Sequence, residues 1–191
     1  RDLGIKYLTV YAFSTENWNR PENEVSALMT LLQNYLKTSI KKSMKNNVRC
    51  RVIGEKSRLS ADIQKAIQNL EETTAENTGL NFTIAINYGS RDEITRAVRK
   101  VAQKCVDGTI RPDEITEADI QKALDTAELP DPDLLIRTCG EQRISNFLLW
   151  QIAYSEIVYT QVLWPDFTPD IFEDAIIEYQ KRDRRFGGRT K

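Results

Sequence analysis

Histidine is the first absence that narrows the chemistry open to this sequence. None of the 191 residues is a histidine. Catalysis by serine or cysteine paired with histidine is therefore excluded within the chain, and so are metal sites built on histidine. Any metal would have to be held by carboxylates and by phosphate oxygens of a ligand, which favours magnesium.

Cysteines and long apolar runs are also scarce. Cys50, Cys105 and Cys139 are an odd number with wide spacing, which is neither a disulfide framework nor a zinc-binding pattern. Free thiols are typical of a reducing compartment, so we predict a cytoplasmic protein. No apolar run approaches the roughly 20 residues of a membrane helix, so any association with a membrane is expected to be peripheral.

An excess of positive charge is the third absence. There are 27 lysines and arginines against 28 acidic residues, for a net charge of −1. This balance argues against a general nucleic-acid-binding protein. The length of 191 residues predicts one domain, large enough to bury about 70% of the surface of the extended chain.

Short aliphatic and β-branched runs alternate with longer segments of helical spacing. Strands are predicted at residues 7–13, 48–53, 80–86, 134–137 and 156–159, and helices at 22–43, 60–77, 90–105, 116–127 and from 168 onward. This alternation favours an α/β fold with a mostly parallel β-sheet, right-handed crossovers and helices on both faces.

The helix at 22–43 has a wide apolar face, which is more typical of a core than of a ligand tunnel. Its members keep helical spacing and are Val25, Leu28, Met29, Leu31, Leu32, Tyr35, Leu36 and Ile40.

Three polar loops directly follow predicted strands: 14–20, 87–91 and 137–146. In parallel sheets, ligands bind beyond the carboxyl ends of the strands. Ser90, with Glu93 three residues later, predicts a capping box at a helix N-terminus, and such termini attract anions. For the loop at 14–20, Ser14 and Asn17 are equally well explained as turn residues, with Trp18 as a lid on the core.

Arginine dominates the loop at 137–146. Arg137, Arg143 and Ser145 would stand at the ligand edge of the sheet, and the guanidinium fork matches a pair of phosphate oxygens. We therefore predict a phosphate or diphosphate site. An equally good explanation is a surface loop whose arginines pair with Glu141 and neighbouring acids.

Five stretches together resemble the cis-prenyltransferase family, most closely its bacterial undecaprenyl diphosphate synthases. They span nearly the whole chain: Tyr11–Pro21 (YAFSTENWNRP), Asn87–Arg91 (NYGSR), Asp133–Glu156, Leu163–Phe167 (LWPDF) and Arg184–Gly188 (RRFGG). The resemblance implies condensation of isopentenyl diphosphate onto an allylic diphosphate such as farnesyl diphosphate. The new double bonds would be cis, the enzyme would need Mg²⁺, and the growing lipid would occupy a dry tunnel between sheet and long helices.

Site residues follow from the same resemblance. The isopentenyl diphosphate site falls on Arg137, Arg143 and Ser145, and Glu156 matches the carboxylate that helps to hold magnesium. The substrate-organising loop supplies three catalytic candidates and two binding residues, which are Ser14, Glu16, Asn17, Trp18 and Arg20. Its asparagine is implicated in proton removal. Arg189 corresponds more loosely to a C-terminal arginine that reaches the partner subunit's diphosphate.

The family also carries an N-terminal Asp-Gly-Asn-Gly-Arg-Trp loop whose aspartate assists ionisation of the allylic diphosphate. Nothing like it occurs here, Gln142 stands where some members have histidine, and Cys139 where serine or glycine is common. We expect the 191-residue chain alone to keep much of the isopentenyl diphosphate site without transferring prenyl groups.

The expected partners are the two diphosphate substrates, a second copy of the chain and a membrane that receives the product, but no nucleic acid. The homodimer rests on the resemblance and on the Gly187-Gly188-Arg189 tail. Three alternatives stay open: a noncatalytic subunit of a cis-prenyltransferase, a phospholigand-binding α/β module, and, least favoured, an RNA-binding protein that uses its basic tail.

Overall fold

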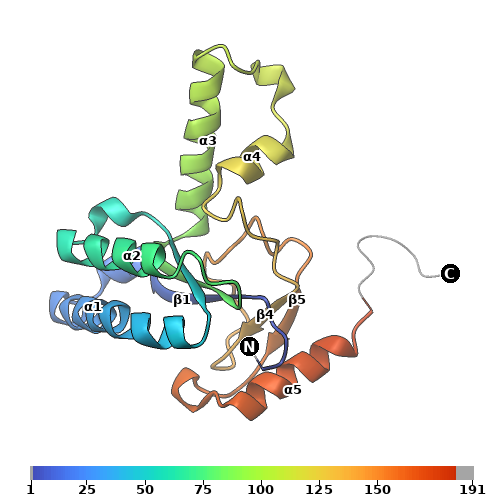
Figure 1. Cartoon of the computed structure of the whole chain (residues 1–191). Helices are drawn as coiled ribbons and strands as arrows, with labels where there is room; N and C mark the ends of the chain where they lie inside the picture. The colour runs from blue at the N-terminus through green and yellow to red at the C-terminus, as the bar shows by residue number, and fades with distance from the viewer. Residues whose placement is uncertain (1, 184–191) are drawn as a thin grey trace. The chain divides into compact units, whose positions relative to one another are not determined.

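The computed structural model describes residues 2–183, and the chain divides into two compact units at the Leu129–Pro130 junction. Each unit has a parallel sheet and at least one helix (Figure 1). All five predicted strands and all five predicted helices are present, so the α/β class is confirmed. Whether the chain is one domain in the functional sense stays a prediction, and the tail with Arg189 lies outside the described residues.

The first unit is built on a three-stranded parallel sheet in the order β1-β3-β2. The strands are β1 (Tyr7–Ser14), β2 (Arg49–Ile53) and β3 (Asn81–Tyr88). The central strand β3 is buried at every residue from Thr83 to Tyr88, and because successive side chains of a strand point to opposite faces, both of its faces are covered. Because Val52 and Tyr11 lie beside Ile84 and Ala85, the strands end at one edge.

Four helices belong to this unit: α1 (Glu22–Lys45), α2 (Ala61–Thr73), α3 (Ser90–Val106) and α4 (Glu117–Ala123). Leu36 of α1 and Ile63, Ile67 and Leu70 of α2 are buried in one cluster with side chains of the sheet. Ser60 caps α2 by accepting a hydrogen bond from the backbone N–H of Ile63. Burial of this apolar face fixes α1 and α2 against the strands.

Three local predictions need correction. Leu31 and Tyr35 do not join the buried face of α1 but are 66% and 48% exposed, because they lie at the margin of a stripe too wide for the sheet to cover. Val98 of α3 is also exposed. Gly89, not Ser90, is the N-cap of α3, because the Glu93 carboxylate faces inward to Tyr88 and Asp125.

The second unit pairs β4 (Leu134–Arg137) with β5 (Glu156–Tyr159) in parallel register. It continues through a 3₁₀ turn at Trp164–Asp166 to α5 (Pro169–Gln180). Thr168 caps α5 and Pro169 is its first residue, as predicted. Within the described part of the chain, no helix is long and apolar enough to cross a membrane.

Candidate functional site

The loop after β1 is a short 3₁₀ helix, Thr15–Asn19, that is fixed by its own side chains. The backbone N–H of Ser14 donates to the Asn17 Oδ1 atom at 2.8 Å. The Trp18 ring meets Phe13 edge to face with centroids 5.2 Å apart. Asn17 and Trp18 therefore do act as a turn residue and a lid, and these contacts hold the loop in one shape at the end of β1.

Asn87, at the end of β3, ties three strand ends together. Its Oδ1 accepts from the Trp18 Nε1–H at 2.7 Å, and its Nδ2 donates to the Glu55 carbonyl at 2.7 Å. Its backbone is left-handed, with φ +47°, a conformation that asparagine tolerates better than most residues. The Arg58 guanidinium lies over the indole ring of Trp18, 4.5 Å from its centroid. The loop at 14–20 is thus positioned by the turn after β2.

Behind this edge lies an ion pair that the sequence did not suggest. Arg96 of α3 donates two hydrogen bonds of 2.7 Å to Asp125, and Asp125 accepts the backbone N–H of Gly54 at 3.0 Å. Burial alone would raise the pKa of Asp125, but the Arg96 guanidinium and the Gly54 N–H outweigh it and hold that pKa below its usual value. The ion pair therefore stabilises the turn after β2, which contains the Glu55 carbonyl that binds Asn87.

Glu93 completes this support. The residue is 1% exposed, and its carboxylate accepts from the Tyr88 hydroxyl at 2.6 Å and from the Asp125 backbone N–H at 2.9 Å. Burial, and next the Glu93 charge, raise the pKa of Tyr88, so its hydroxyl keeps its proton.

We expect Asp125→Asn to destabilise the protein by about 3 kcal/mol at pH 7, because Arg96 loses its buried partner. The folded-state pKa of Asp125 is depressed, so its contribution is complete above the ordinary aspartate pKa of about 3.9 and disappears as the pH falls through the lower folded value. Urea denaturation at several pH values measures this. The gap between wild type and variant should narrow below about pH 4.

Asp113→Asn is the control, because Asp113 forms an exposed ion pair with Arg111. It should change stability by less than about 0.5 kcal/mol at any pH. A pH-independent gap for Asp125→Asn would show that the carboxylate charge is not what stabilises the turn.

Glu16 and Arg20 are not drawn toward Asn17. Both side chains are exposed. Arg20 pairs with Glu24 on α1 at 2.6 Å, and Glu16 accepts from the Thr15 hydroxyl at 3.1 Å. In this arrangement both side chains lie at the solvent-exposed edge of the loop.

In the second unit, Arg137 stands at the end of β4 as predicted. Its Nε is buried and has no hydrogen-bond partner among residues 2–183. A buried guanidinium donor without a partner is costly. An anion accepting from Arg137 would remove that cost, which favours the phosphate interpretation.

The loop after Arg137 is held in an unusual backbone conformation. Cys139, Ser145, Asn146 and Leu148 all have positive φ, between 49° and 65°. Two hydrogen bonds anchor its start, from the N–H groups of Cys139 and Gly140 to the carbonyls of Val162 and Thr160, both at 2.9 Å. Such clustered strain is typical of ligand-binding loops, where surrounding structure maintains it.

Arg143 is exposed and forms an ion pair with Glu141, as the alternative explanation of this loop predicted. The pair does not exclude a ligand, because an exposed ion pair is weak and a diphosphate would compete for it. Arg137 and Arg143 share no common partner within the described part of the chain.

Glu156 begins β5 and pairs with Arg182 at 2.9 Å. Arg182 also donates to the Ile157 carbonyl at 2.8 Å, so the carboxylate is held in place. Residues 2–183 contain no group of three potential metal ligands. Magnesium is commonly bound by one or two carboxylates together with substrate phosphates and water. One fixed carboxylate therefore fits Mg²⁺ that arrives with a diphosphate.

A pocket of about 340 Å³ opens in the first unit between α1 and the strands. Its lining is mostly apolar on the strand side and mixed on α1, and consists of Leu8, Tyr35, Thr38, Ser39, Lys42, Ser43, Asn46, Val48, Leu80 and Phe82. It adjoins the core cluster, because its lining residues Val48 and Phe82 also pack against that cluster. Leu28, Met29 and Leu32 pack against the same cluster but do not line the pocket.

Comparison with known proteins decides the family. The prenyltransferase family model, described as undecaprenyl diphosphate synthase, matches residues 1–187. The chain belongs to this family. It is 56% identical over 185 residues to a ditrans,polycis-undecaprenyl-diphosphate synthase, (2E,6E)-farnesyl-diphosphate specific, of Haemophilus ducreyi, covering 97% of this chain and 76% of that protein. It is 54% identical over 190 residues to an isoprenyl transferase of Rhizobium meliloti, covering 100% and 77%.

A solved structure shows the same family fold. The lavandulyl diphosphate synthase of Lavandula x intermedia, crystallised with dimethylallyl diphosphate, superimposes with a TM-score of 0.94 at 42% identity, covering 97% of this chain and 80% of that one. The resemblance inferred from the motifs is therefore confirmed, whereas the roles of individual site residues in this undecaprenyl diphosphate synthase family member stay predictions.

Proposed function

We propose that the protein is a cis-prenyltransferase that condenses isopentenyl diphosphate onto an allylic diphosphate, farnesyl diphosphate or similar, to give a long-chain polyprenyl diphosphate. The observation that carries the proposal is the family match over residues 1–187. The polar loops at the ends of β1, β3 and β4 support it, because they carry the family's motif residues.

Arg137, Arg143 and Ser145 bind the diphosphate of isopentenyl diphosphate in this proposal. Arg137 contributes a buried donor that lacks a partner among the described residues, and Arg143 exchanges Glu141 for the ligand. The condensation passes through a carbocation-like state, so it depends on positioning and on neutralising the leaving diphosphate.

In this proposal, the loop after β1 carries the residues that lie next to the reacting atoms of the substrates. Ser14 and Asn17 lie where the loop leaves the strand, with Glu16 as a third catalytic candidate. Trp18 and Arg20 shape the substrate face of the loop. Bound magnesium supplies charge neutralisation at the diphosphate, and Glu156 is the carboxylate that would hold it.

Glu156→Gln tests the magnesium assignment. In the chain extended at its N-terminus with the family's Asp-Gly-Asn-Gly-Arg-Trp segment, the Mg²⁺ concentration for half-maximal turnover should rise at least tenfold, because a neutral amide is a weaker ligand than a carboxylate. Glu178→Gln is the matched control, since Glu178 pairs with the same Arg182 at 2.6 Å but is not placed in the site. Equal effects of the two substitutions would show that Glu156 acts only by holding Arg182.

We further propose a cytoplasmic homodimer that delivers its product to a membrane. The dimer is tested by light scattering, where a monomer at micromolar concentration would count against it.

The reaction itself is tested by incubating the protein with labelled isopentenyl diphosphate, farnesyl diphosphate and Mg²⁺. We expect label to pass into a hexane-extractable polyprenyl product when the chain is extended at its N-terminus with the family's Asp-Gly-Asn-Gly-Arg-Trp segment, and not with the 191 residues alone. Binding of the diphosphates by the extended chain without any such product would instead support a noncatalytic subunit or a phospholigand-binding module. RNA affinity that falls steeply with salt would support the RNA-binding alternative.

A further inference from the structure

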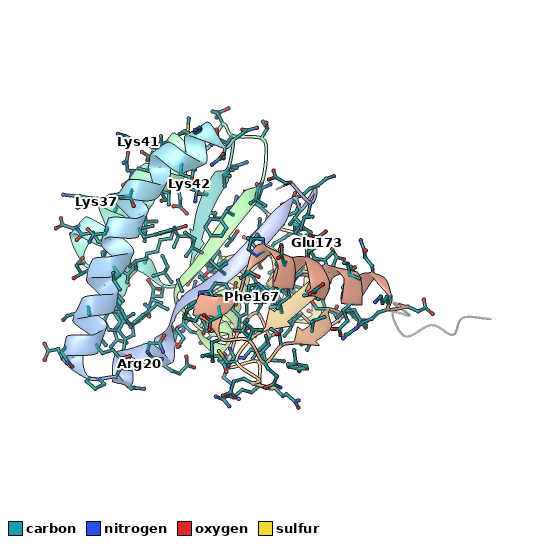
Figure 2. The ribbon with its side chains drawn as sticks, turned by 90° about the horizontal axis from the view of Figure 1, so that it is seen from below. Arg20, Lys37, Lys41, Lys42, Phe167 and Glu173 are labelled. Atoms are coloured by element: carbon teal, nitrogen blue, oxygen red, sulfur yellow. The ribbon has the colours of Figure 1, made fainter. Side chains whose placement is uncertain are left out.

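The C-terminal half of α1 carries a concentration of positive charge that no described residue neutralises. No acidic residue occurs between Glu24 and Glu55, a stretch that contains six basic residues. Lys37, Lys41 and Lys45 are exposed, and none of the three forms an ion pair with another residue in 2–183. Because they are spaced by four residues, they form one row along the helix. Figure 2 shows Lys37, Lys41 and Lys42 along this half of α1.

Two large apolar side chains lie on the side of α1 next to the lysine row. Leu31 and Tyr35 are 66% and 48% exposed and share one side of the helix with Thr38 and Lys42, at spacings of four, three and four residues. Large exposed apolar side chains beside a basic row are typical of helices that lie in a membrane interface. A surface that binds only polyanions in solution would gain nothing from an exposed leucine such as Leu31.

The side of α1 that carries Leu31 and Tyr35 also borders the pocket of the first unit. Tyr35, Thr38 and Lys42 are pocket-lining residues, and the opposite wall includes the apolar Leu8, Leu80 and Phe82. A surface that rests on lipid at this side of α1 would therefore bring the pocket, whose strand side is apolar, to the bilayer.

We infer that this face of α1, defined by Leu31, Tyr35, Lys37, Lys41 and Lys45, docks on the surface of an anionic lipid bilayer. The lysines bind lipid phosphates, and Leu31 and Tyr35 enter the boundary between headgroups and acyl chains. Because the whole chain has a net charge of −1, the electrostatic attraction to anionic lipid would come from this face and not from the protein as a whole. The choice of a bilayer as partner rests in part on the proposed function, whose product is a long polyprenyl chain.

The test measures cosedimentation of the protein with vesicles of phosphatidylcholine, with and without phosphatidylglycerol, over a range of salt concentrations. We expect binding that requires phosphatidylglycerol and weakens with salt. Changing all three row lysines (Lys37→Gln, Lys41→Gln, Lys45→Gln) should lower the partition coefficient on the order of 100-fold. Leu31→Ser should lower it roughly tenfold at every salt concentration.

The control removes the same charge elsewhere in the first unit, by Arg99→Gln, Lys104→Gln and Lys122→Gln, which are exposed residues of α3 and α4. It should bind vesicles like the wild type. An equal loss in this control would overturn the proposal by showing that only total charge matters. Absence of vesicle binding by the wild type would also overturn the proposal. So would vesicle binding that Leu31→Ser does not change and that added RNA displaces from the lysines.

Self-association is the remaining occupant of this face. A change in light-scattering mass in the lysine variant would assign the face to contact with a second copy and would overturn the bilayer assignment. Turnover by the chain extended at its N-terminus, measured in detergent without vesicles, reports on the proposed reaction separately. Turnover without vesicle binding would reject the surface and keep the reaction, whereas vesicle binding without turnover would do the reverse.

Discussion

Arg143→Ala in the enzyme completed at its N-terminus should weaken binding of isopentenyl diphosphate by roughly 2–4 kcal/mol, which is the usual effect of removing one partner of a close charge pair. The side chain is 68% exposed and is held by Glu141 alone among the described acids, so its loss should cost little folding stability. The measurements are the KM for isopentenyl diphosphate and its binding by calorimetry. Arg143→Lys should recover only part of the affinity, because the bidentate fork is lost.

Arg111→Ala is the matched control. Arg111 is 71% exposed and also pairs with an acid two residues away, Asp113, but it lies before the short helix α4 and outside every predicted site. It should leave the KM unchanged. An unchanged KM in Arg143→Ala as well would remove Arg143 from the site and would leave the surface ion pair with Glu141 as its explanation.

Gly54→Ala should destabilise the protein by more than about 4 kcal/mol, which places it among the most damaging single substitutions. Gly54 has φ +114°, and a Cβ there would collide with the carbonyl oxygen of Ile86 and meet that of Asn87 at 3.0 Å. Both obstacles are backbone atoms of β3 and cannot rotate away. The carboxyl ends of β2 and β3 would have to separate, and the hydrogen bond between Asn87 and Trp18 would be lost.

Gly108→Ala isolates the conformational part of this effect. Gly108 has φ +70° but open space around it, so alanine should cost only about 1 kcal/mol there. Chemical denaturation of both variants gives the comparison. Equal losses would mean that backbone conformation alone, and not the approach of β2 to β3, requires glycine at position 54.

Much of the fold was predictable because its signals are local. The strand at Tyr7–Ser14, the helix from Glu22 and the cap at Thr168 each depend on side chains a few residues apart. The order of strands and helices then limited the topology to a parallel α/β arrangement. The same reasoning placed polar loops at strand ends, and it exposed the motifs that the family comparison confirmed.

The supports of the candidate site could not be predicted, because they join distant parts of the chain. Trp18 and Asn87 are 69 residues apart, and Gly54 and Asp125 are 71 apart. Nothing in the local pattern around Asp125 indicates that its carboxylate will receive Arg96 and a backbone N–H. Asn87 came closest, since an asparagine directly after a buried strand suggests a functional turn.

By itself, then, the sequence determined the secondary structure, the family and the chemical types available to the site, because periodicity and motif spacing are properties of neighbouring residues. Only the tertiary structure decided which side chains hold the loop at 14–20 and left the Arg137 Nε buried with no partner among residues 2–183. It also decided that Leu31 faces solvent. These outcomes depend on which surfaces meet when the strands and helices pack. When the apolar face of a helix is wider than the sheet surface that it packs on, its sequence does not show which edge of that face will be covered.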